Sequence, residues 1–314
     1  MQPPVRIGTR ASKLALTQAR WVQARVAEAL GASAADADQV APLITITTTG
    51  DRVQDRRLLE IGGKQLFTKE IEVALIEGSI DLAVHSMKDV PAEQPPGLAI
   101  AAIPVREDSR DVLISRSHAS LAALPAGAQI GTASLRRQAQ LLARRPDLAI
   151  VMMRGNVDTR LRKLDDGEAD AIVMAMAGLK RLGLEAHVVE AFDATAIPTA
   201  PGQGALAIQA RAADAGAAWL ASLNHESSAI TVAAERGALE ALEGSCRTAM
   251  GAHASLDGAR LTLVVEALSA DGRQRWRREA EAVLSVDPRA EAHAVGLALG
   301  HEIRAEAGDR LIVG

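Results

Sequence analysis

Cationic side chains recur in this sequence where apolar, strand-like runs end. Arg10 follows "RIGT", and "TASLRRQ" places Arg136 and Arg137 where an amphipathic helix is expected to begin. Arg154 and Arg160 flank the run "GNVDT" in a similar way. The carboxyl ends of strands and the free N–H groups of helix starts are the places where open α/β sheets bind anions. Because a guanidinium suits carboxylate and phosphate equally, the pattern predicts a cleft for a polyanion of either kind.

Solvated surface charge is the alternative explanation for these residues, and it accounts well for any one of them. It accounts poorly for their concentration on the carboxyl side of strands, which continues at Lys180 and Arg181 in "GLKRLG". An arginine pair in the first turn of a helix also opposes the helix dipole, so it carries a cost that an anionic partner would offset.

One carboxylate stands out in the run "HSMKDVP". Asp89 follows an apolar strand, and Pro91 holds Val90 in an extended conformation. An aspartate in a turn commonly binds the backbone, and that explanation stays open. In a cationic cleft the same carboxylate could exchange protons or stabilise a cation that forms during a reaction. Lys88 beside it would keep it ionised.

Cys246, in the run "LEGSC", is the only cysteine among the 314 residues. A lone cysteine is either a small buried hydrophobe or a point of covalent chemistry. Gly244 follows an expected helix and favours an exposed loop, and both interpretations stay open at this point. One cysteine cannot form an internal disulfide, which indicates a reducing, cytoplasmic setting.

Composition and motifs disfavour several classes of function. The net charge of −4 and the aromatic content of 2% oppose binding to nucleic acid. The start, "MQPPVRIGTR", lacks an apolar signal region, and no run is long and apolar enough to span a bilayer, so neither export nor a membrane is expected. No P-loop, H-E-x-x-H or C-x-x-C motif is present and the seven histidines are scattered, so no metal site is expected.

The elements that must position these residues alternate between strand and helix. A helix is expected over 11–30, where apolar residues recur at helical spacing behind a Ser12 cap. Strands are expected at 4–10, 42–51, 80–86 and 97–105, with a further helix over 68–78. This alternation predicts an α/β fold with mixed, mostly parallel sheets.

Changes in the pattern predict the domain organisation. The charged segment "PVREDSRDVLIS" predicts a crossing into a second lobe, because the alternation restarts after it, and "TAPGQGALAIQAR" is expected to return to the first lobe. Farther on, a helix, the cysteine loop, three strand-like runs and a last helix over 288–307 predict a smaller α+β domain. The predicted domains are 1–104 plus 201–222, 105–200 and 223–314.

A weak internal echo supports two similar lobes. Gly78 and Asp81 stand between a helix and an apolar strand, as do Gly167 and Asp170. The glycine would end each helix and the aspartate would open each buried strand. Shared architecture and chance explain this echo equally well.

In their order and spacing, eight stretches resemble the porphobilinogen deaminase family, also called hydroxymethylbilane synthases, over nearly the whole chain: "RIGTRASKLAL", "GGKQLFTKEIE", "DLAVHSMKDVP", "GTASLRRQAQL", "RGNVDTRL", "AGLKRLG", "GQGALAI" and "LEGSC". The resemblance implies a monomer of three domains. Two are lobes like those of periplasmic ligand-binding proteins, with the active cleft between them, and the third carries a cofactor cysteine on a loop.

The resemblance also implies the chemistry. The family is a transferase of haem biosynthesis that condenses four porphobilinogen molecules into the linear tetrapyrrole hydroxymethylbilane and releases ammonia. The primer is a dipyrromethane cofactor in thioether linkage, which the resemblance assigns to Cys246. Each pyrrole carries an acetate and a propionate, so the growing chain is a polycarboxylate that arginines would neutralise. Asp89 would stabilise the azafulvenium-like cation left by ammonia and assist proton transfer.

Further roles follow residue by residue from the matching motifs. Side chains that would bind the cofactor are Lys88, Ser134, Arg136 and Arg137, with Thr132 and Asp51 beside them. Side chains that would bind the incoming porphobilinogen are Arg10, Ser12, Arg154 and Arg160, with Arg181, Lys64 and Gln203 beside them.

The sequence departs from the family pattern in three places. Gln65 stands where glycine is common, Glu60 stands where some members have lysine, and "RTAMG" after Cys246 differs from the commoner run with proline. The main rival interpretation is a non-catalytic, two-lobed anion-binding protein, which gives Asp89 and Cys246 no role. A nucleic-acid-binding module is a second rival, opposed by charge and composition.

Overall fold

The computed structural model describes residues 4–52, 66–242 and 248–311. Among these residues the chain forms two compact units, which are described one at a time. The first unit holds 4–52, 66–107 and 205–229, and the second holds 108–204, 230–242 and 248–311. The three-domain division expected from the sequence stays a prediction.

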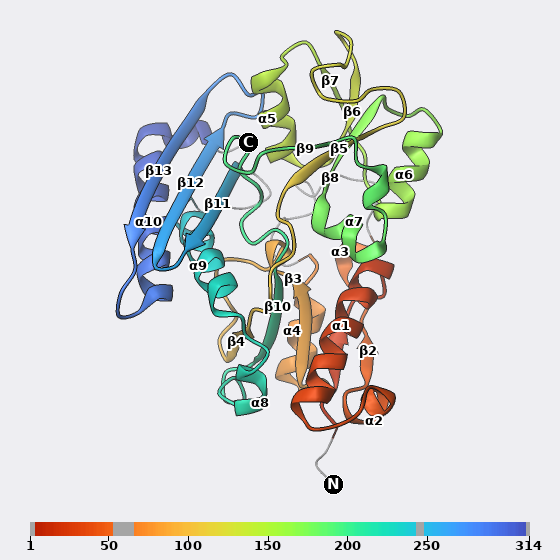
Figure 1. The fold of residues 1–314 in the computed structure, drawn as a ribbon, viewed down its shortest axis with the longest axis vertical. Helices are drawn as coiled ribbons and strands as arrows, with labels where there is room; N and C mark the ends of the chain where they lie inside the picture. The colour runs from red at the N-terminus through yellow and green to blue at the C-terminus, as the bar shows by residue number, and fades with distance from the viewer. Residues whose placement is uncertain (1–3, 53–65, 243–247, 312–314) are drawn as a thin grey trace. The chain divides into compact units, whose positions relative to one another are not determined.

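The first unit is built on a mixed five-stranded sheet. Its strands lie in the order β2 (Leu43–Thr45), β1 (Ile7–Thr9), β3 (Leu82–Ser86), β10 (Leu206–Arg211) and β4 (Leu98–Ala102). β1 pairs in parallel with β2 and β3, whereas β10 runs antiparallel to both of its neighbours. β10, from the segment after residue 200, therefore lies in the sheet of the first unit, where it fills the gap between β3 and β4 (Figure 1).

Helices cover both faces of this sheet because successive strand residues point to opposite sides. Leu82 and Val84 pack with α1 (Lys13–Ala29), and Ala83 packs with α4 (Lys69–Ile76) on the other face. The short helices α2 (Ala37–Val40), α3 (Thr49–Arg52) and α8 (Ala218–Ala221) complete the unit. The strand expected over 42–51 ends at Thr45, because the polar threonines after it lead into α3.

The second unit contains a sheet of the same design. Its strands lie in the order β7 (Ala149–Val151), β6 (Gln129–Gly131), β8 (Ala171–Ala175), β5 (Asp111–Ser115) and β9 (Glu190–Ala191). β5 is the reversed strand here, as β10 is in the first unit. α5 (Leu135–Arg144) packs on one face, and α6 (Val157–Asp165) and α7 (Met176–Leu182) pack on the other.

Equivalent residues build the two sheets, so the internal echo reflects shared architecture. Gly78 and Gly167 both adopt left-handed backbone, with φ of 72° and 77°. Asp81 accepts a main-chain hydrogen bond from the residue before β1 at 2.9 Å, and Asp170 accepts one from the first residue of β6 at 2.7 Å. In each case the glycine ends a helix and the aspartate fixes the next strand against its parallel neighbour.

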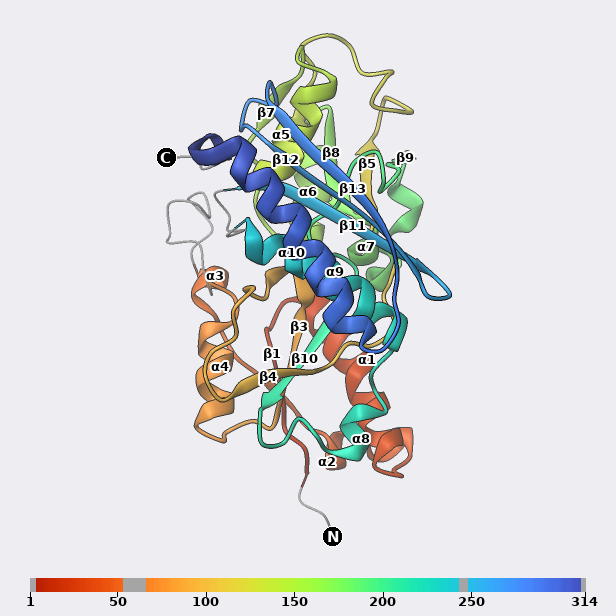
Figure 2. The same ribbon diagram turned by 90° about the vertical axis from the view of Figure 1, so that its left-hand side faces the viewer.

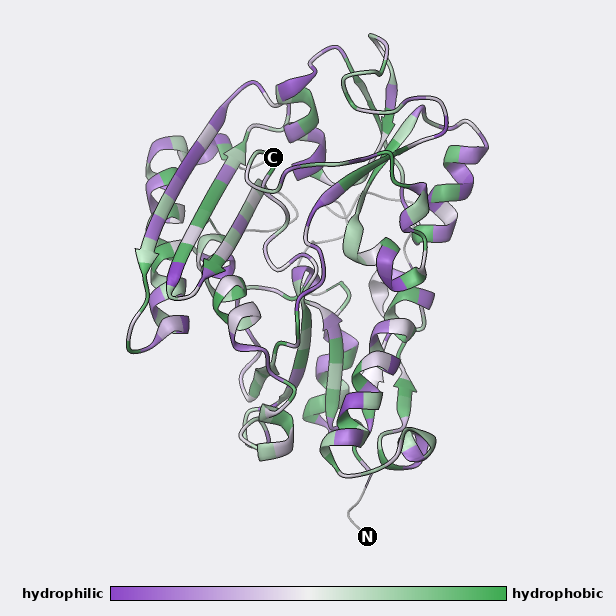
Figure 3. Ribbon diagram, in the orientation of Figure 1, coloured by the Kyte–Doolittle hydropathy of each residue, from purple (hydrophilic) through white to green (hydrophobic). Residues whose placement is uncertain are grey.

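A three-stranded antiparallel sheet completes the second unit, in the order β11 (Ala249–Asp257), β12 (Arg260–Leu268) and β13 (Arg275–Val283). α9 (Glu226–Ala241) and α10 (Pro288–Ala307) share a core with it, and α10 lies across the sheet in Figure 2. β12 is mainly apolar, whereas β13 at the edge is mainly polar (Figure 3). The structure confirms the predicted fold class and the last helix, which the sequence placed at 288–307. Across the described residues, no helix combines the length and the apolar character that crossing a membrane needs.

Candidate functional site

Three predicted site residues of the second unit converge on one buried carboxylate. Asp111, the first residue of β5, accepts a hydrogen bond from Arg136 Nη1 at its Oδ2, at 2.7 Å. Its Oδ1 accepts from Arg137 Nε at 3.1 Å and Nη2 at 2.7 Å. Gln203 Nε2 donates to the same oxygen at 2.8 Å. Side chains from α5 and the Gln203 loop are therefore fixed by a single acceptor on β5.

The two arginines of this cluster use their nitrogens differently. Arg137 also donates from Nη1 to the carbonyl oxygen of Val173, at 2.9 Å, so all three of its nitrogens have protein partners. The hydrogen bonds of Arg136 all leave from Nη1, to Asp111, to Gln140 Oε1 at 2.8 Å and to the Pro198 carbonyl oxygen at 3.2 Å. Within the part of the chain that the structure describes, Arg136 Nε and Nη2 have no hydrogen-bond partner.

Burial and charge dominate the energetics of this cluster. Burial alone would raise the pKa of Asp111, but the adjacent Arg136 and Arg137 guanidiniums hold it well below its ordinary value. Burial lowers the pKa of Arg136, with Arg137 adding to that effect and Asp111 opposing it. Two guanidiniums face one carboxylate, which leaves an excess positive charge on residues that are only 6% and 7% exposed. Such a cluster favours an anionic ligand, because an uncompensated buried charge is costly.

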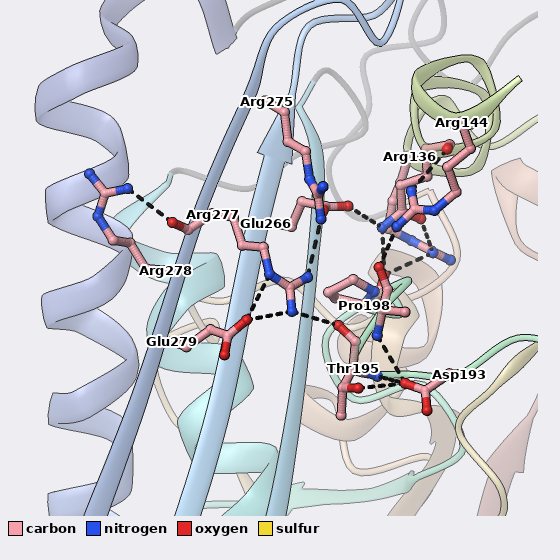
Figure 4. A network of polar contacts seen from close by, with 12 residues as sticks. Arg136, Arg144, Asp193, Thr195, Pro198, Glu266, Arg275, Arg277, Arg278 and Glu279 are labelled. Atoms are coloured by element: carbon pink, nitrogen blue, oxygen red, sulfur yellow. Dashed lines mark hydrogen bonds and ion pairs between the residues drawn. The ribbon is translucent and has the colours of Figure 1, made fainter. Parts of the chain in front are cut away.

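A second buried carboxylate ties Arg136 to the three-stranded sheet. Glu266 of β12 is fully buried and accepts from Arg275 Nε at 2.6 Å and from Gln140 Nε2 at 3.1 Å (Figure 4). Gln140 Nε2 also donates to the Pro198 carbonyl oxygen at 2.8 Å. Both of these partners only accept, so the amide nitrogen of Gln140 must face them and its oxygen must face Arg136.

Serine caps begin a helix after the equivalent strand in each unit. Ser134 accepts from the main-chain N–H of Arg137 at 3.4 Å, and Thr132 Oγ1 accepts from the N–H of Ser134 at 3.1 Å. Ser12 accepts from the N–H of Ala15 at 3.3 Å, which confirms its expected role as a cap. These hydroxyl groups shape the turns in which the predicted arginines lie.

The other predicted residues of the second unit lie close to strand ends. Arg154 follows β7, and Arg160 in α6 donates from Nε to the Gly155 carbonyl oxygen at 2.9 Å. Arg181 in α7 donates from Nη2 to the Gly204 carbonyl oxygen at 2.7 Å. Arg181 therefore supports the loop that presents Gln203 to the Asp111 cluster.

In the first unit, Asp89 ends the short 3₁₀ helix η3 (Met87–Asp89) that follows β3. Met87 and Val90 are buried, and the N–H of Met87 donates to the Ala205 carbonyl oxygen at 3.0 Å, which anchors the turn. Lys88 and Asp89 between them are exposed. The Asp89 carboxylate has no hydrogen-bond partner among the described residues, so a role in holding the turn together is not supported.

Arg10 and Asp51 form an ion pair in the first unit. Arg10 donates from Nε to Asp51 Oδ1 at 3.1 Å and also through Nη2, and its guanidinium lies 4.2 Å from the centre of the Phe67 ring. Thr48 Oγ1 donates to Asp51 Oδ2 at 2.8 Å. Burial raises the pKa of Asp51, but Arg10 and Thr48 lower it by more, and the net pKa lies below its ordinary value.

Cys246 and Lys64, like the departures Gln65 and Glu60, lie outside the described residues. The buried groups Asp111, Gln140 and Glu266 were not expected from the motifs. Asp111 gave one signal in the sequence, because an acidic residue opens the fully buried strand "DVLIS". An ionised group in that position requires a paired cation.

These features define a class of α/β protein with two similarly built sheets. One unit contains an arginine cluster suited to binding carboxylates, and the other contains an exposed aspartate. A family model described as "Porphobilinogen deaminase, dipyromethane cofactor binding domain" matches residues 5–218. A second, described as "Porphobilinogen deaminase, C-terminal domain", matches residues 229–305. The chain belongs to the porphobilinogen deaminase family, and the resemblance found in the sequence motifs is confirmed.

Curated relatives named as porphobilinogen deaminases match this chain over almost its whole length. The porphobilinogen deaminase of Caulobacter vibrioides (strain NA1000 / CB15N) is 61% identical, over 99% of this chain and 98% of its own. That of Phenylobacterium zucineum (strain HLK1) is 60% identical, over 99% of both chains. Among solved structures, a periplasmic substrate-binding protein of an ABC transporter from Coxiella burnetii is 17% identical, with a TM-score of 0.43 over 70% of this chain and 89% of that chain. Family membership favours an enzyme over the non-catalytic alternative.

Proposed function

We propose that this protein condenses four porphobilinogen molecules into hydroxymethylbilane, as a transferase of tetrapyrrole and haem biosynthesis. Each condensation breaks one carbon–nitrogen bond of the substrate, forms one carbon–carbon bond and releases one ammonia. Water then cleaves the bond between the tetrapyrrole and its primer and supplies the hydroxyl group of the product. The observation that carries the proposal is the buried cluster of Arg136, Arg137 and Asp111, which has an excess positive charge and spare guanidinium donors. Such a site suits the acetate and propionate groups of pyrroles, and membership in the family supports this substrate.

The residues present fit the family's dipyrromethane cofactor, because Arg136 offers two unused donors to a carboxylate from a nearly buried position. When bound through Cys246, the cofactor supplies the terminal pyrrole carbon to which the first substrate joins. The cysteine would serve as a tether rather than as the nucleophile of each turnover. The other residues proposed to hold the cofactor are Lys88, Ser134, Arg137, Thr132 and Asp51.

Asp89 is the proposed catalytic carboxylate. It lies exposed on an anchored turn, and no described residue occupies its oxygens. Its negative charge would stabilise the cation that forms as ammonia leaves the substrate, and would assist the transfer of the pyrrole proton. The residues proposed to bind the substrate carboxylates are Arg10, Ser12, Arg154 and Arg160, flanked by Arg181, Lys64 and Gln203.

We further propose that the protein works in the cytoplasm as a monomer and binds no nucleic acid. The single cysteine supports a reducing compartment, and the net charge of −4 opposes a nucleic-acid partner. Light scattering in solution should give the mass of one chain.

Intact mass spectrometry tests the function most directly. The purified protein should carry an adduct of dipyrromethane mass, and Cys246→Ala should carry none. Apoprotein should gain the adduct when it is given porphobilinogen, and the loaded protein should then release ammonia and hydroxymethylbilane. A chain that keeps its bare mass after incubation with porphobilinogen would contradict the proposal.

A further inference from the structure

We propose that Gln209 is a positioning residue for the turn that carries Asp89, and that it acts through a chain of hydrogen bonds ending at Pro91. The chain begins at His85, passes through Gln209 and Gln94, and ends at the Pro91 carbonyl oxygen. His85 precedes the turn and Pro91 follows it, so the chain ties the two ends of this segment together. The inference rests on the proposed function and deepens it, because it states how the catalytic carboxylate is held in place.

One carbonyl group fixes the direction of every hydrogen bond in this chain. The Pro91 carbonyl oxygen can only accept, and Gln94 Nε2 donates to it at 3.2 Å. The amide oxygen of Gln94 then faces Gln209, whose Nε2 donates to it at 2.9 Å. Gln209 Oε1 faces His85 Nε2 at 3.1 Å, so that nitrogen of the imidazole carries the hydrogen. Each side chain donates to the next, and an apolar replacement at either glutamine breaks the chain.

The middle of the chain is buried, which makes its geometry hard to change. Gln209 of β10 is 0% exposed and His85 of β3 is 5% exposed, so neither can exchange its partner for water. Glu72 of α4 borders the same amide: burial raises the pKa of Glu72, whereas Thr68 and Gln209 oppose that effect. Gln94 is only half-buried, so the chain can be broken there with less harm to the core.

The backbone between Asp89 and Pro91 has little freedom to undo this tie. Val90 between them is extended, with φ of −87° and ψ of 124°, as is usual before a proline. The proline ring fixes the next φ angle. The N–H of Val90 also donates to the Met87 carbonyl oxygen at 3.0 Å, which closes the turn around Asp89. Holding the Pro91 carbonyl group therefore restricts where Asp89 can lie.

The segment that contains β10 thus holds the turn at both ends by different means. At the entry, the main-chain N–H of Met87 donates to the Ala205 carbonyl oxygen at 3.0 Å, and this bond does not depend on the side chain at 209. At the exit, Gln209 acts through the side chain of Gln94. Loss of either amide should therefore leave the turn formed but shift the carboxylate that it carries.

The experiment breaks the chain at one glutamine or at both, and compares the effect with and without the Asp89 carboxylate. Gln94→Met and Gln209→Met remove the amide but keep a side chain of similar length. Each variant is made alone, with the other, and in the Asp89→Asn background. kcat and KM are measured on protein whose intact mass shows the adduct, and thermal unfolding midpoints show whether each variant is folded.

We expect each single variant to lower kcat by about tenfold and to keep KM within about twofold of native, because the carboxylate shifts while the proposed substrate arginines stay in place. The combined Gln94 and Gln209 variant should lose no more than either alone, since both substitutions break one chain. In the Asp89→Asn background, Gln94→Met should lower kcat by less than about twofold, because the charge that the chain positions is already gone. A loss of equal size in both backgrounds would indicate a general structural effect and would overturn the inference.

Gln23→Met is the matched control. Gln23 is another buried glutamine of the first unit, and its Nε2 donates to Asp38 Oδ1 at 2.9 Å and to the Ala41 carbonyl oxygen at 2.8 Å. Its replacement should lower the thermal midpoint while kcat stays within about twofold of native, because these partners lie away from the turn. A fall in kcat as large as that of Gln94→Met would contradict a specific role for the chain.

If Gln209→Met does not fold, Gln94→Met decides the question alone, because its half-buried position tolerates the change better. A folded Gln94→Met variant with native kcat refutes this inference and leaves the proposed function standing. If the native protein itself shows neither adduct nor turnover, the proposed function fails instead.

Discussion

At the residue scale, the exposure of Asp89 makes its role testable without disturbing the fold. Asp89→Asn removes the charge but keeps the size, and no described hydrogen bond is lost. The variant should keep its thermal midpoint and its adduct, while kcat falls about 100-fold or more because the developing cation loses its counter-charge. Glu93→Gln neutralises another exposed carboxylate on the following segment and should leave kcat near native. Near-native turnover of Asp89→Asn would show that the carboxylate is not catalytic.

His85 gives the first unit a dependence on pH. It is a buried residue of β3 whose Nε2 lies 3.1 Å from Gln209 Oε1. Burial lowers the pKa of His85 to about 4, and the positive charge of Arg10 adds to the effect, whereas Gln209 opposes it. The unfolded chain takes up a proton at a higher pH than the folded one, so the stabilisation is complete above about pH 6.5 and is lost as the pH falls toward 4.

Because of the lowered pKa of His85, the free energy of unfolding should therefore fall by roughly 3 kcal/mol between about pH 7 and pH 4. Buried Glu72 has a raised pKa, which acts in the opposite direction, so the test compares variants rather than absolute slopes. In urea titrations across this range, His85→Gln should lose part of the pH dependence, and His301→Gln at an exposed position should retain it. If the unfolding free energy of His85→Gln depended on pH as strongly as that of the native protein, His85 would not be the source of this pH dependence.

At the element scale, glycines allow the three-stranded sheet to lie directly on α5 and its neighbours. A Cβ atom on Gly251 of β11 would collide with the Pro198 carbonyl oxygen and would lie 3.2 Å from Gln140 Nε2. A Cβ on Gly272 would lie 2.5 Å from the Ala139 carbonyl oxygen. These close approaches bring Glu266 within reach of Gln140, and so connect the sheet to Arg136.

Gly251→Ala tests this contact between elements. Because the obstructing atoms belong to the backbone, the variant should lose about 2 kcal/mol of unfolding free energy, measured by denaturant titration. Its kcat/KM should also fall, since Gln140 is displaced from Arg136. Gly216→Ala is the matched control, because a Cβ there meets nothing within 4 Å and the backbone is not left-handed, so it should change stability by less than about 0.5 kcal/mol. A Gly251→Ala variant as stable and active as this control would refute the account.

At the scale of the whole molecule, local patterns predicted the elements well and the contacts between them poorly. Local pattern placed the first and the last long helix close to their observed bounds, with the cap at Ser12 marking the start of the first, because these signals lie within a few residues. Asp111 was missed because its partners are 25, 26 and 92 residues away along the chain. Arginines at helix starts indicated that an anion binds there. Their spacing could not show that a carboxylate of the protein itself neutralises part of their positive charge. Family motifs supplied the roles proposed for Asp89 and Cys246.

The position of β10 has a consequence for the order in which the molecule is made. The residues of the second unit's five-stranded sheet follow one another from Asp111 to Ala191, so that sheet can form as soon as its own segment leaves the ribosome. The first sheet cannot, because the strand that joins β3 to β4 begins only at Leu206. Until then the nascent chain carries two open strand edges, which are sites of mispairing. The sheet of the first unit, although its other four strands come earlier in the chain, is therefore the later of the two to close.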